Sequence, residues 1–334
     1  MEAKKSGKKA ADGKKTVFVT GMAGYVGSLL CRELDRADWC GKFYGMDVKT
    51  PLAKYAKGTF RKMDINDPSL VDWVKEVKPD ILIHLAFVLN PIQDETLMSH
   101  INIDGSRNTL KAIEEAGVKK ALIVSSATAY GAFVDNPVPL KETDPIRPHP
   151  HFSYARDKAV VEGMCGEFMD MHPEITMSLV RPVVIYGPHV DNYLSWLFLL
   201  PLGLLPSEHE TAIQFVHEDD VVGSILHIID HDGRGAYNLA PADHMSMREI
   251  HQLAGRSVMG LPDWVLQRLF SWTWKLKLPI AKVPGTFYDY VRYPWLVDNS
   301  RIVNDLGYRF RYSTRETVEI MFRSKNVKFK SQAA

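Results

Sequence analysis

The sequence predicts a doubly wound α/β fold, in which helices cover both faces of a parallel sheet, followed by a smaller C-terminal lobe. Three observations predict it. In the first half of the chain, short β-branched runs alternate with longer segments of helical periodicity. Strand segments such as residues 81–85 are apolar almost throughout, which is typical of parallel strands buried on both faces. Beyond Tyr186 the pattern changes to shorter, proline-punctuated pieces rich in Trp, Leu and Tyr.

The expected elements follow one another as alternating strands and helices. Strands are expected at residues 16–20, 43–47, 81–85, 121–125 and 176–181, with one more ending before Asp64. Helices are expected at residues 25–36, 68–77, 95–116 and 154–171. The sheet domain then spans residues 16–186 and regains residues 213–240, and the lobe comprises residues 187–212 and 241–325. A basic flexible tail (1–15) and a short tail (326–334) complete the chain.

Composition excludes several classes of protein. A hydrophobic content of 46% fills a substantial core, and 41 basic against 40 acidic residues leave a formal charge of +1, so no nucleic-acid partner is expected. The cysteines Cys31, Cys40 and Cys165 are odd in number and lack C-x-x-C spacing, so we expect neither disulfides nor zinc, and a reducing cytoplasm fits best.

Two further segments invite a membrane or metal interpretation. The most apolar run, residues 194–205, contains Pro201 and falls short of the roughly twenty residues that a spanning helix needs, so we expect no transmembrane segment. His149 and His151 lack a carboxylate at ligand spacing, so no metal is expected.

Between the first strand and the first helix lies a G-x-x-G-x-x-G loop, which contains Tyr25 and Val26 between its second and third glycines. Gly21 would turn the chain off the strand, Gly24 would admit a pyrophosphate, and Gly27 would let helix and strand pack closely. The start of the helix then faces the phosphates. Glycines also mark ordinary tight turns, but the strand-to-helix context favours a dinucleotide site in a Rossmann-type sheet.

Two carboxylates fit the adenosine half of such a cofactor. Asp47 ends the second strand, where it can accept hydrogen bonds from ribose hydroxyls and repel a 2′-phosphate, which favours NAD over NADP. Lys49 partly offsets that repulsion. Asp64, followed by Ile65, either meets the adenine amino group or caps the helix that begins near Pro68.

The sequence also places a phenol and an ammonium on one helix face, because Tyr154 and Lys158 are four residues apart. Moving a phenol pKa from near 10 toward about 7 takes roughly 4 kcal/mol. One ammonium about 4 Å away supplies approximately that much at an effective dielectric constant of about 20. Tyr154 could then exchange a proton with a substrate hydroxyl, and Ser126, after the strand at 121–125, could bond the same oxygen.

The segments TGMAGYVGS, HLAF, INIDGSRNTL, VSSATAYG, YARDK and RPVVIYGP occur in the order typical of extended short-chain dehydrogenases/reductases, the NAD-dependent epimerase/dehydratase family. The chain resembles that family over about residues 16–240. The resemblance implies that Tyr154 and Lys158 are catalytic, that Ser126 orients the substrate and that Asn102 supports the lysine through water. It also favours the adenine contact for Asp64 and a homodimer through the helices at 95–116 and 154–171.

The resemblance implies further contacts. For the cofactor these are Leu85, Ala86 and Phe87 after the fourth strand and Pro182 and Val183 after the sixth, beside Gly21, Gly24, Tyr25, Val26, Gly27, Asp47, Asp64, Ile65 and Lys158. For the substrate they are Val88, Thr128, Val184 and Gln214.

Departures from the family pattern narrow the reaction. Ala127 and Thr128 stand where dehydratases and decarboxylases of the family have acidic residues. The asparagine and arginine that hold the diphosphate in sugar-nucleotide members are missing near Val184 and Gln214. We therefore expect reversible NAD-dependent hydride transfer at a secondary alcohol or ketone of a small or apolar substrate. A UDP-sugar epimerase with tightly bound NAD is the alternative, followed by a non-catalytic dinucleotide sensor.

The C-terminal lobe, expected to bind the substrate, carries two apolar stretches, residues 194–205 and 264–279. They could contact an apolar ligand or a second copy of the chain, or form ordinary lobe core. His217, Glu218, Asp219 and Asp220 are interpreted as a helix start, where acids meet the positive end of the dipole.

Overall fold

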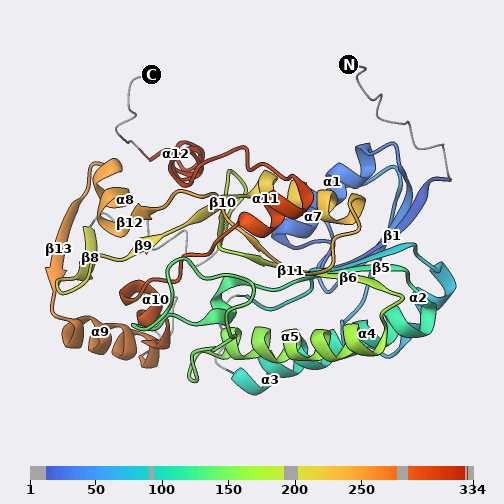
Figure 1. Ribbon diagram of the computed structural model, residues 1–334, viewed down its shortest axis with the longest axis horizontal. Coiled ribbons are helices and arrows are strands. Elements are labelled where there is room, and N and C mark those ends of the chain that lie inside the picture. The colour runs from blue at the N-terminus through green and yellow to red at the C-terminus, as the bar shows by residue number, and fades with distance from the viewer. Residues whose placement is uncertain (1–12, 90–93, 192–201, 277–284, 328, 330–334) are drawn as a thin grey trace, which may run out of the picture.

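The computed structural model describes residues 13–89, 94–191, 202–276, 285–327 and 329 (Figure 1). Its centre is a seven-stranded parallel sheet in the order β3-β2-β1-β4-β5-β6-β11. The strands are β1 (Lys15–Thr20), β2 (Cys40–Asp47), β3 (Gly58–Lys62), β4 (Ile81–His84), β5 (Lys120–Val124), β6 (Thr176–Pro182) and β11 (Gly235–Leu239). The expected doubly wound α/β class is confirmed.

Helices cover both faces of this sheet (Figure 1). One face carries α1 (Tyr25–Arg36), α7 (Glu218–Asp230) and α11 (Ser300–Leu306). The other carries α2 (Ser69–Val77), α4 (Gly105–Ala116) and α5 (Ser153–Met171), with α3 (Glu95–Ser99) beside α5. Side chains of β1 alternate between the two apolar cores: Val17 and Val19 belong to one, and Phe18 to the other. This double burial explains why the strands are apolar almost throughout.

Short elements, which include those of the C-terminal lobe, lie at one end of the sheet. Two-stranded pairs join β7 (Val184–Tyr186) to β10 (Phe215–His217), β9 (Ala212–Ile213) to β12 (Met245–Ser246), and β8 (Leu202–Pro206) to β13 (Ser257–Leu261). The helices here are α8 (Met247–Leu253), α9 (Asp263–Lys275), α10 (Tyr288–Arg292) and α12 (Thr314–Ser324). A 3₁₀ turn, η3 (Gly285–Phe287), precedes α10.

Most expected helices and strands coincide with observed ones, but one expected helix is interrupted by a π-helical turn. The helix expected at 25–36 is α1, residue for residue, and the acidic segment after His217 does begin α7. The helix expected at 95–116 instead consists of α3, a π-helical turn η1 (His100–Asp104) and α4. Of the apolar run 194–205, residues 194–201 lie outside the described residues, as do residues 1–12 and 330–334 of the expected tails. No helix within the described ranges is long and apolar enough to cross a membrane.

The parallel sheet determines where a ligand can bind. Strands β1, β4, β5 and β6 are neighbours and end at the same edge, so the loops that follow them converge there. These loops hold the glycines, Phe87, Ser126 and Val183.

Candidate active site

The loop after β1 takes a shape that requires glycine. Gly21 has a φ of +76°, and a Cβ placed on it would lie 2.7 Å from the backbone nitrogen of Ala86. A Cβ on Gly27 would lie within 3.0 Å of the Gly21 carbonyl oxygen. No side chain caps the start of α1 at Gly24, so the first amides of this helix can bond an external anion. This cradle fits a dinucleotide phosphate, and Gly21, Gly24 and Val26 would lie against it.

Tyr25 closes one side of the loop. Its hydroxyl donates to the buried carboxylate of Glu218, which also accepts from the backbone N–H of His189 at 3.2 Å. Burial and the neighbouring carboxylate raise the pKa of Tyr25 far above its usual value. The phenol is therefore a structural link between α1 and α7, and it stays protonated.

Asp47 lies beside the glycine loop, as its position at the end of β2 predicts. One carboxylate oxygen accepts the backbone N–H of Ala23 at 3.0 Å and the other that of Lys49 at 2.9 Å. These two bonds fix the carboxylate next to the loop, which is the position a ribose partner needs.

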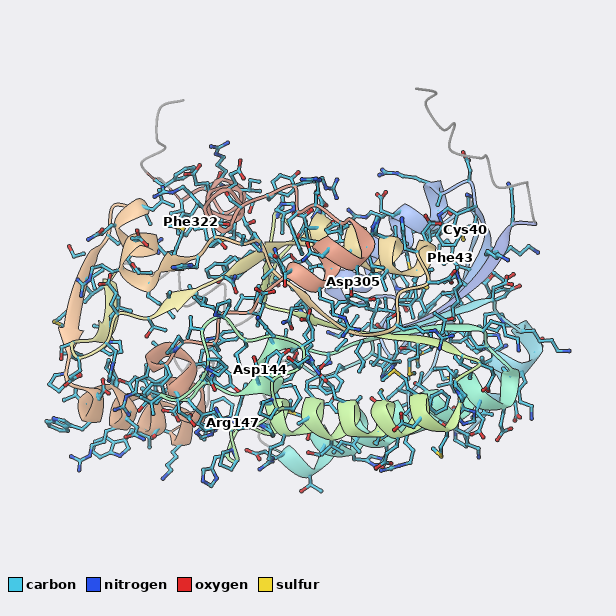
Figure 2. The ribbon with its side chains drawn as sticks, viewed as in Figure 1. Cys40, Phe43, Asp144, Arg147, Asp305 and Phe322 are labelled. Carbon is cyan, nitrogen blue, oxygen red and sulfur yellow. The ribbon has the colours of Figure 1, made fainter. Side chains whose placement is uncertain are left out.

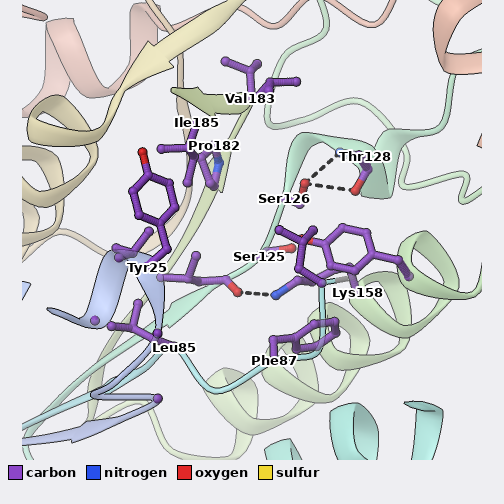
Figure 3. A pocket seen from close by; sticks show the side chains of 18 of the residues that line it. Tyr25, Leu85, Phe87, Ser125, Ser126, Thr128, Lys158, Pro182, Val183 and Ile185 are labelled. Atoms are coloured by element: carbon purple, nitrogen blue, oxygen red, sulfur yellow. Dashed lines mark hydrogen bonds between the residues drawn. The ribbon is translucent and has the colours of Figure 1, made fainter. Parts of the chain in front are cut away.

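A cleft that is open to solvent gathers most of the predicted residues (Figure 3). Its predicted members are Gly21, Gly24, Tyr25, Val26, Gly27, Leu85, Phe87, Ser126, Thr128, Tyr154, Lys158, Pro182, Val183 and Val184. Its other members are Leu89, Val124, Ser125, Ile185, Phe287 and Trp295. The wall is mostly apolar, and its polar side chains are concentrated where β5 meets α5.

Tyr154 and Ser126 form the polar centre of the cleft. The Ser126 hydroxyl, which lies near the phenol of Tyr154, accepts from the Thr128 backbone N–H at 3.2 Å and hydroxyl at 2.9 Å (Figure 3). Burial raises the pKa of Tyr154 to about 12, and the nearby Ser126 hydroxyl opposes this shift only in part. The spacing of Tyr154 and Lys158 predicts a pKa nearer 7 for the phenol, but in the chain itself desolvation raises this pKa.

Lys158 is oriented away from the phenol. Its Nζ donates to the Val124 carbonyl at 2.6 Å and lies 3.4 Å from the ring centroid of Phe87, compared with 5.8 Å from that of Tyr154 (Figure 3). Burial lowers the pKa of Lys158 to about 7, although nearby Glu162 opposes the shift. The lysine can therefore lose its proton near neutral pH.

Asn102 lies within the π-helical turn, and its side chain bonds groups other than Lys158. Its Oδ1 accepts the backbone N–H of Val88 at 2.8 Å, and its Nδ2 donates to Asp157 at 2.9 Å. Asn102 thus ties the loop after β4 to α5, the helix that carries Tyr154. The water-mediated role implied by the family resemblance remains a prediction.

A buried polar chain beneath this turn was missed from the sequence. His84 bonds the hydroxyl of Thr20 at 2.7 Å and that of Ser106 at 3.0 Å, and Ser106 in turn donates to the carbonyl of Asn102 at 2.6 Å. Burial lowers the pKa of His84 to about 3, so the ring is neutral and serves as a bridge between β1, β4 and α4. Only the histidine in an otherwise apolar strand could have indicated it.

Several predicted residues lie outside the cleft lining. Asp64 accepts the Asn66 backbone N–H at 2.9 Å, and Ile65 is buried against Gly105. Gln214 is buried, and its amide bonds backbone groups of Pro241 and Val297. Ala86 and Val88 belong to the loop after β4, next to the lining residues Leu85 and Phe87.

Phe287 and Trp295 are cleft residues that the sequence did not reveal. They come from the C-terminal lobe, more than a hundred residues after Tyr154. Tyr290 holds this segment in place: its hydroxyl donates to the Thr128 carbonyl at 2.7 Å, and its own carbonyl accepts from the Trp295 indole at 3.1 Å. Among the described residues no group of three or more His, Cys, Asp or Glu side chains could hold a metal, and His149 pairs with Asp289.

A doubly wound sheet with a glycine cradle, an acidic group at the end of β2 and a Tyr/Lys pair at the carboxyl edge defines a dinucleotide-dependent enzyme of the short-chain dehydrogenase/reductase class. The sequence also matches the model of the NAD dependent epimerase/dehydratase family over residues 17–240. The chain belongs to this family, and it is accordingly an NAD-dependent enzyme.

Individual relatives are distant. The chain is 27% identical to a UDP-glucose 4-epimerase of Mycolicibacterium smegmatis over 267 residues, covering 74% of this chain and 83% of that protein. An uncharacterized protein of Mycobacterium tuberculosis is 21% identical over 94% of this chain and 85% of its own length. The fold is similar to the UDP-glucose 4-epimerase of Thermotoga maritima solved with UDP-glucose, with a TM-score of 0.73, 19% identity, and coverage of 93% of this chain and 98% of the other.

Proposed function

We propose that the protein catalyses reversible, NAD-dependent hydride transfer at the secondary alcohol or ketone carbon of a small or apolar substrate, with Tyr154 as the acid/base. The observation that carries the proposal is the position of Tyr154 next to Ser126 within a cleft whose wall is mostly apolar. The glycine cradle leads into the same cleft.

In this proposal NAD, when bound, accepts or returns the hydride. Tyr154 takes the hydroxyl proton during oxidation and returns it during reduction, and Ser126 bonds the same substrate oxygen. Moving the Tyr154 pKa from about 12 toward neutrality takes roughly 7 kcal/mol. An ammonium about 4 Å away supplies about 4 kcal/mol of this. We infer that Lys158 exchanges its bond to Val124 for a place nearer the phenol and the cofactor.

The substrate half of the cleft supports an apolar ligand. Val183, Val184 and Ile185 stand on one side, and Phe287 and Trp295 come from the lobe. Gln214, expected near the substrate, has its amide engaged with buried backbone groups. These side chains offer no cation for a diphosphate.

The similarity to UDP-glucose 4-epimerases favours a second candidate, an epimerase of UDP-sugars that keeps NAD bound through the cycle. To separate the two, purified protein is assayed for retained cofactor and for conversion of UDP-sugars without added NAD. Conversion under these conditions would replace the reductase proposal. Turnover of apolar secondary alcohols only with added NAD would support it. A non-catalytic sensor is less well supported, because Tyr154 and Lys158 are both present.

The acid/base role is tested by replacing Tyr154→Phe. We expect turnover to fall by about 10²–10⁴, the usual contribution of a general acid/base, while NADH affinity stays unchanged. Tyr44→Phe is the matched control, because Tyr44 is a half-buried phenol on β2 and stands outside the cleft lining. Full activity of the Tyr154 variant would overturn the mechanism.

A further inference from the structure

Helix α9 carries an exposed aromatic and basic face. Trp264, Arg268 and Trp272 follow one another at intervals of four residues and so share one side of the helix. Trp264 is 61% exposed, Trp272 is 66% exposed, and Leu276, one interval further, is 67% exposed. The opposite side holds Leu266, which is fully buried. We refer to Trp264, Arg268, Leu269, Trp272, Lys275 and Leu276 as the α9 face.

The charge on the α9 face is of one sign. Arg268 and Lys275 are exposed, and the Arg268 guanidinium lies 5.3 Å from the ring centroid of Trp264. The acidic residue of the helix, Asp263, is largely buried in an ion pair with Arg292 at 2.5 Å. Glu208 bonds the backbone N–H of Asp263 at the start of the helix. Within the helix itself the exposed side chains therefore carry no negative charge: they are apolar, positive or, at Gln267, neutral and polar.

The size and position of the α9 face favour a lipid surface over a second protein. With about 150–250 Å² for a whole aromatic side chain, the exposed parts of two tryptophans and two leucines amount to roughly 400 Å². That is about half of the ~800 Å² that each partner contributes to a stable protein interface. The helix also lies at a corner of the molecule, at the opposite end from α2 (Figures 1 and 2).

We propose that the α9 face docks the protein on an anionic lipid surface. Tryptophan prefers the membrane interface, where its ring is embedded and its N–H stays hydrated. Arginine and lysine between the apolar side chains can extend their charged ends to lipid phosphates. In this arrangement α9 lies in the plane of the interface without crossing it.

Docking through α9 would bring the substrate cleft close to the bilayer. Turn η3 packs on α9, with Gly285 against Ser271, and its Phe287 lines the cleft. The Phe287 ring lies 5.9 Å from that of Phe152, which lies 5.9 Å from that of Tyr154. Packed aromatic rings thus connect α9 to the catalytic phenol, so docking would place the apolar part of the cleft near lipid that can hold an apolar substrate. This part of the inference rests on the proposed function.

The test is sedimentation of the purified full-length protein with vesicles of phosphatidylcholine alone and of phosphatidylcholine mixed with phosphatidylglycerol. We expect binding to the anionic vesicles that weakens with added salt. Trp264→Ser combined with Trp272→Ser should lower the partition coefficient at least about tenfold. Arg268→Gln should lower it roughly fivefold, the usual effect of one basic residue at an anionic surface.

Matched variants show whether vesicle binding is specific to the α9 face. Trp39→Ser alters a partly exposed tryptophan beyond the end of α1 and should bind vesicles like the wild type. Tyr154→Phe should also bind normally, so loss of turnover and loss of docking are distinguishable. The proposal would be overturned if the wild-type protein sedimented with neither type of vesicle. The proposal would also be overturned if the double tryptophan variant bound vesicles as well as the wild type. It would likewise be overturned if the only effect of the double substitution were to dissociate a dimer.

Discussion

At the scale of single residues, the cleft contains two buried groups, Tyr154 and Lys158, whose pKa values shift in opposite directions from their usual values. Burial raises the pKa of Tyr154 to about 12 and lowers that of Lys158 to about 7. Each shift disfavours the charged form. In the chain alone the phenol stays neutral across the physiological range, and the lysine titrates within it.

The lysine shift predicts a pH-dependent stability. Between about pH 7 and 10.5 the unfolded chain holds a proton that folded Lys158 has released, so the free energy of unfolding rises with pH through this window. Below about pH 7 the lysine is protonated in both states and the full cost of burying the charge is present. Lys158→Met should therefore be more stable than the wild type near pH 6, by about 2–4 kcal/mol, with the advantage fading toward pH 10.

Urea unfolding of the protein without cofactor, followed from pH 6 to 10, measures this difference. Lys119→Met is the control, because Lys119 is exposed, and its effect on stability should not vary with pH in this way. A Lys158→Met variant that is less stable than the wild type at pH 6 would contradict the expected cost of burying the ammonium.

The catalytic residues could be predicted because their local spacing and order along the chain are informative. Tyr154 and Lys158 share a helix face, and Ser126 follows a strand that ends at the ligand-binding edge. The direction in which Lys158 points could not be predicted. It depends on the Val124 carbonyl, at the end of β5, and on the Phe87 ring, in the loop after β4. Burial, and therefore both pKa shifts, is likewise a property of the packed molecule.

At the scale of elements, the turn from β1 into α1 is the part of the site most fully determined by local sequence. Its predicted helix has the observed bounds, and its glycines take up the close contacts that the motif requires. The π-helical turn at Asn102 is the opposite case. Ser106 donates to the Asn102 carbonyl while the Asn102 amide bonds Val88 and Asp157, and these partners come from other elements. Helical periodicity alone predicts one continuous helix.

The glycine loop supports a prediction about one element. Gly27→Ala places a methyl group within 3.0 Å of the Gly21 carbonyl oxygen, so α1 must move away from the loop. We expect a loss of about 1–3 kcal/mol in the free energy of unfolding, as for other overpacked sites, together with loss of NADH binding. Urea unfolding and fluorescence titration with NADH measure the two effects.

Gly166→Ala provides the matched comparison, because Gly166 lies in the middle of α5 with open space around the added methyl group. This change should stabilise the protein by roughly 0.5–1 kcal/mol and leave NADH affinity unaltered. Equal effects of the two substitutions would contradict the steric argument. Wild-type NADH affinity in a folded Gly27→Ala protein would contradict the assignment of the cradle.

At the scale of the whole molecule, the cleft is completed by segments far apart in sequence. The predicted half comes from loops of the sheet, where the order of motifs also predicts their place in space. Phe287 and Trp295 come from the lobe and reach the cleft because Tyr290 bonds the Thr128 carbonyl. Such long-range contacts leave no periodicity in the sequence. For the same reason the sequence left open whether residues 264–279 are core, although the structure exposes one side of α9.

The family resemblance also predicts a homodimer through α4 and α5, and apolar side chains are exposed on this side of the molecule. Val160 on α5 is 46% exposed and Leu97 on the adjoining α3 is 47% exposed. In a two-fold interface both copies contribute the same surface patch. Val160→Glu would therefore bury two carboxylates in the interface, which disfavours association. We expect a wild-type dimer and a Val160→Glu monomer in light scattering after size-exclusion chromatography.

Two control variants test whether dissociation is specific to the α4 and α5 interface. Val134→Glu changes a valine that is 78% exposed and outside α3, α4 and α5, so this variant should remain dimeric. The Trp264→Ser and Trp272→Ser double variant should also remain dimeric, because lipid docking and dimerisation would use different helices. A wild-type monomer at all concentrations, or a dimer that only the tryptophan variant dissociates, would exclude the α4 and α5 interface. The second result would identify α9 as the contact between copies.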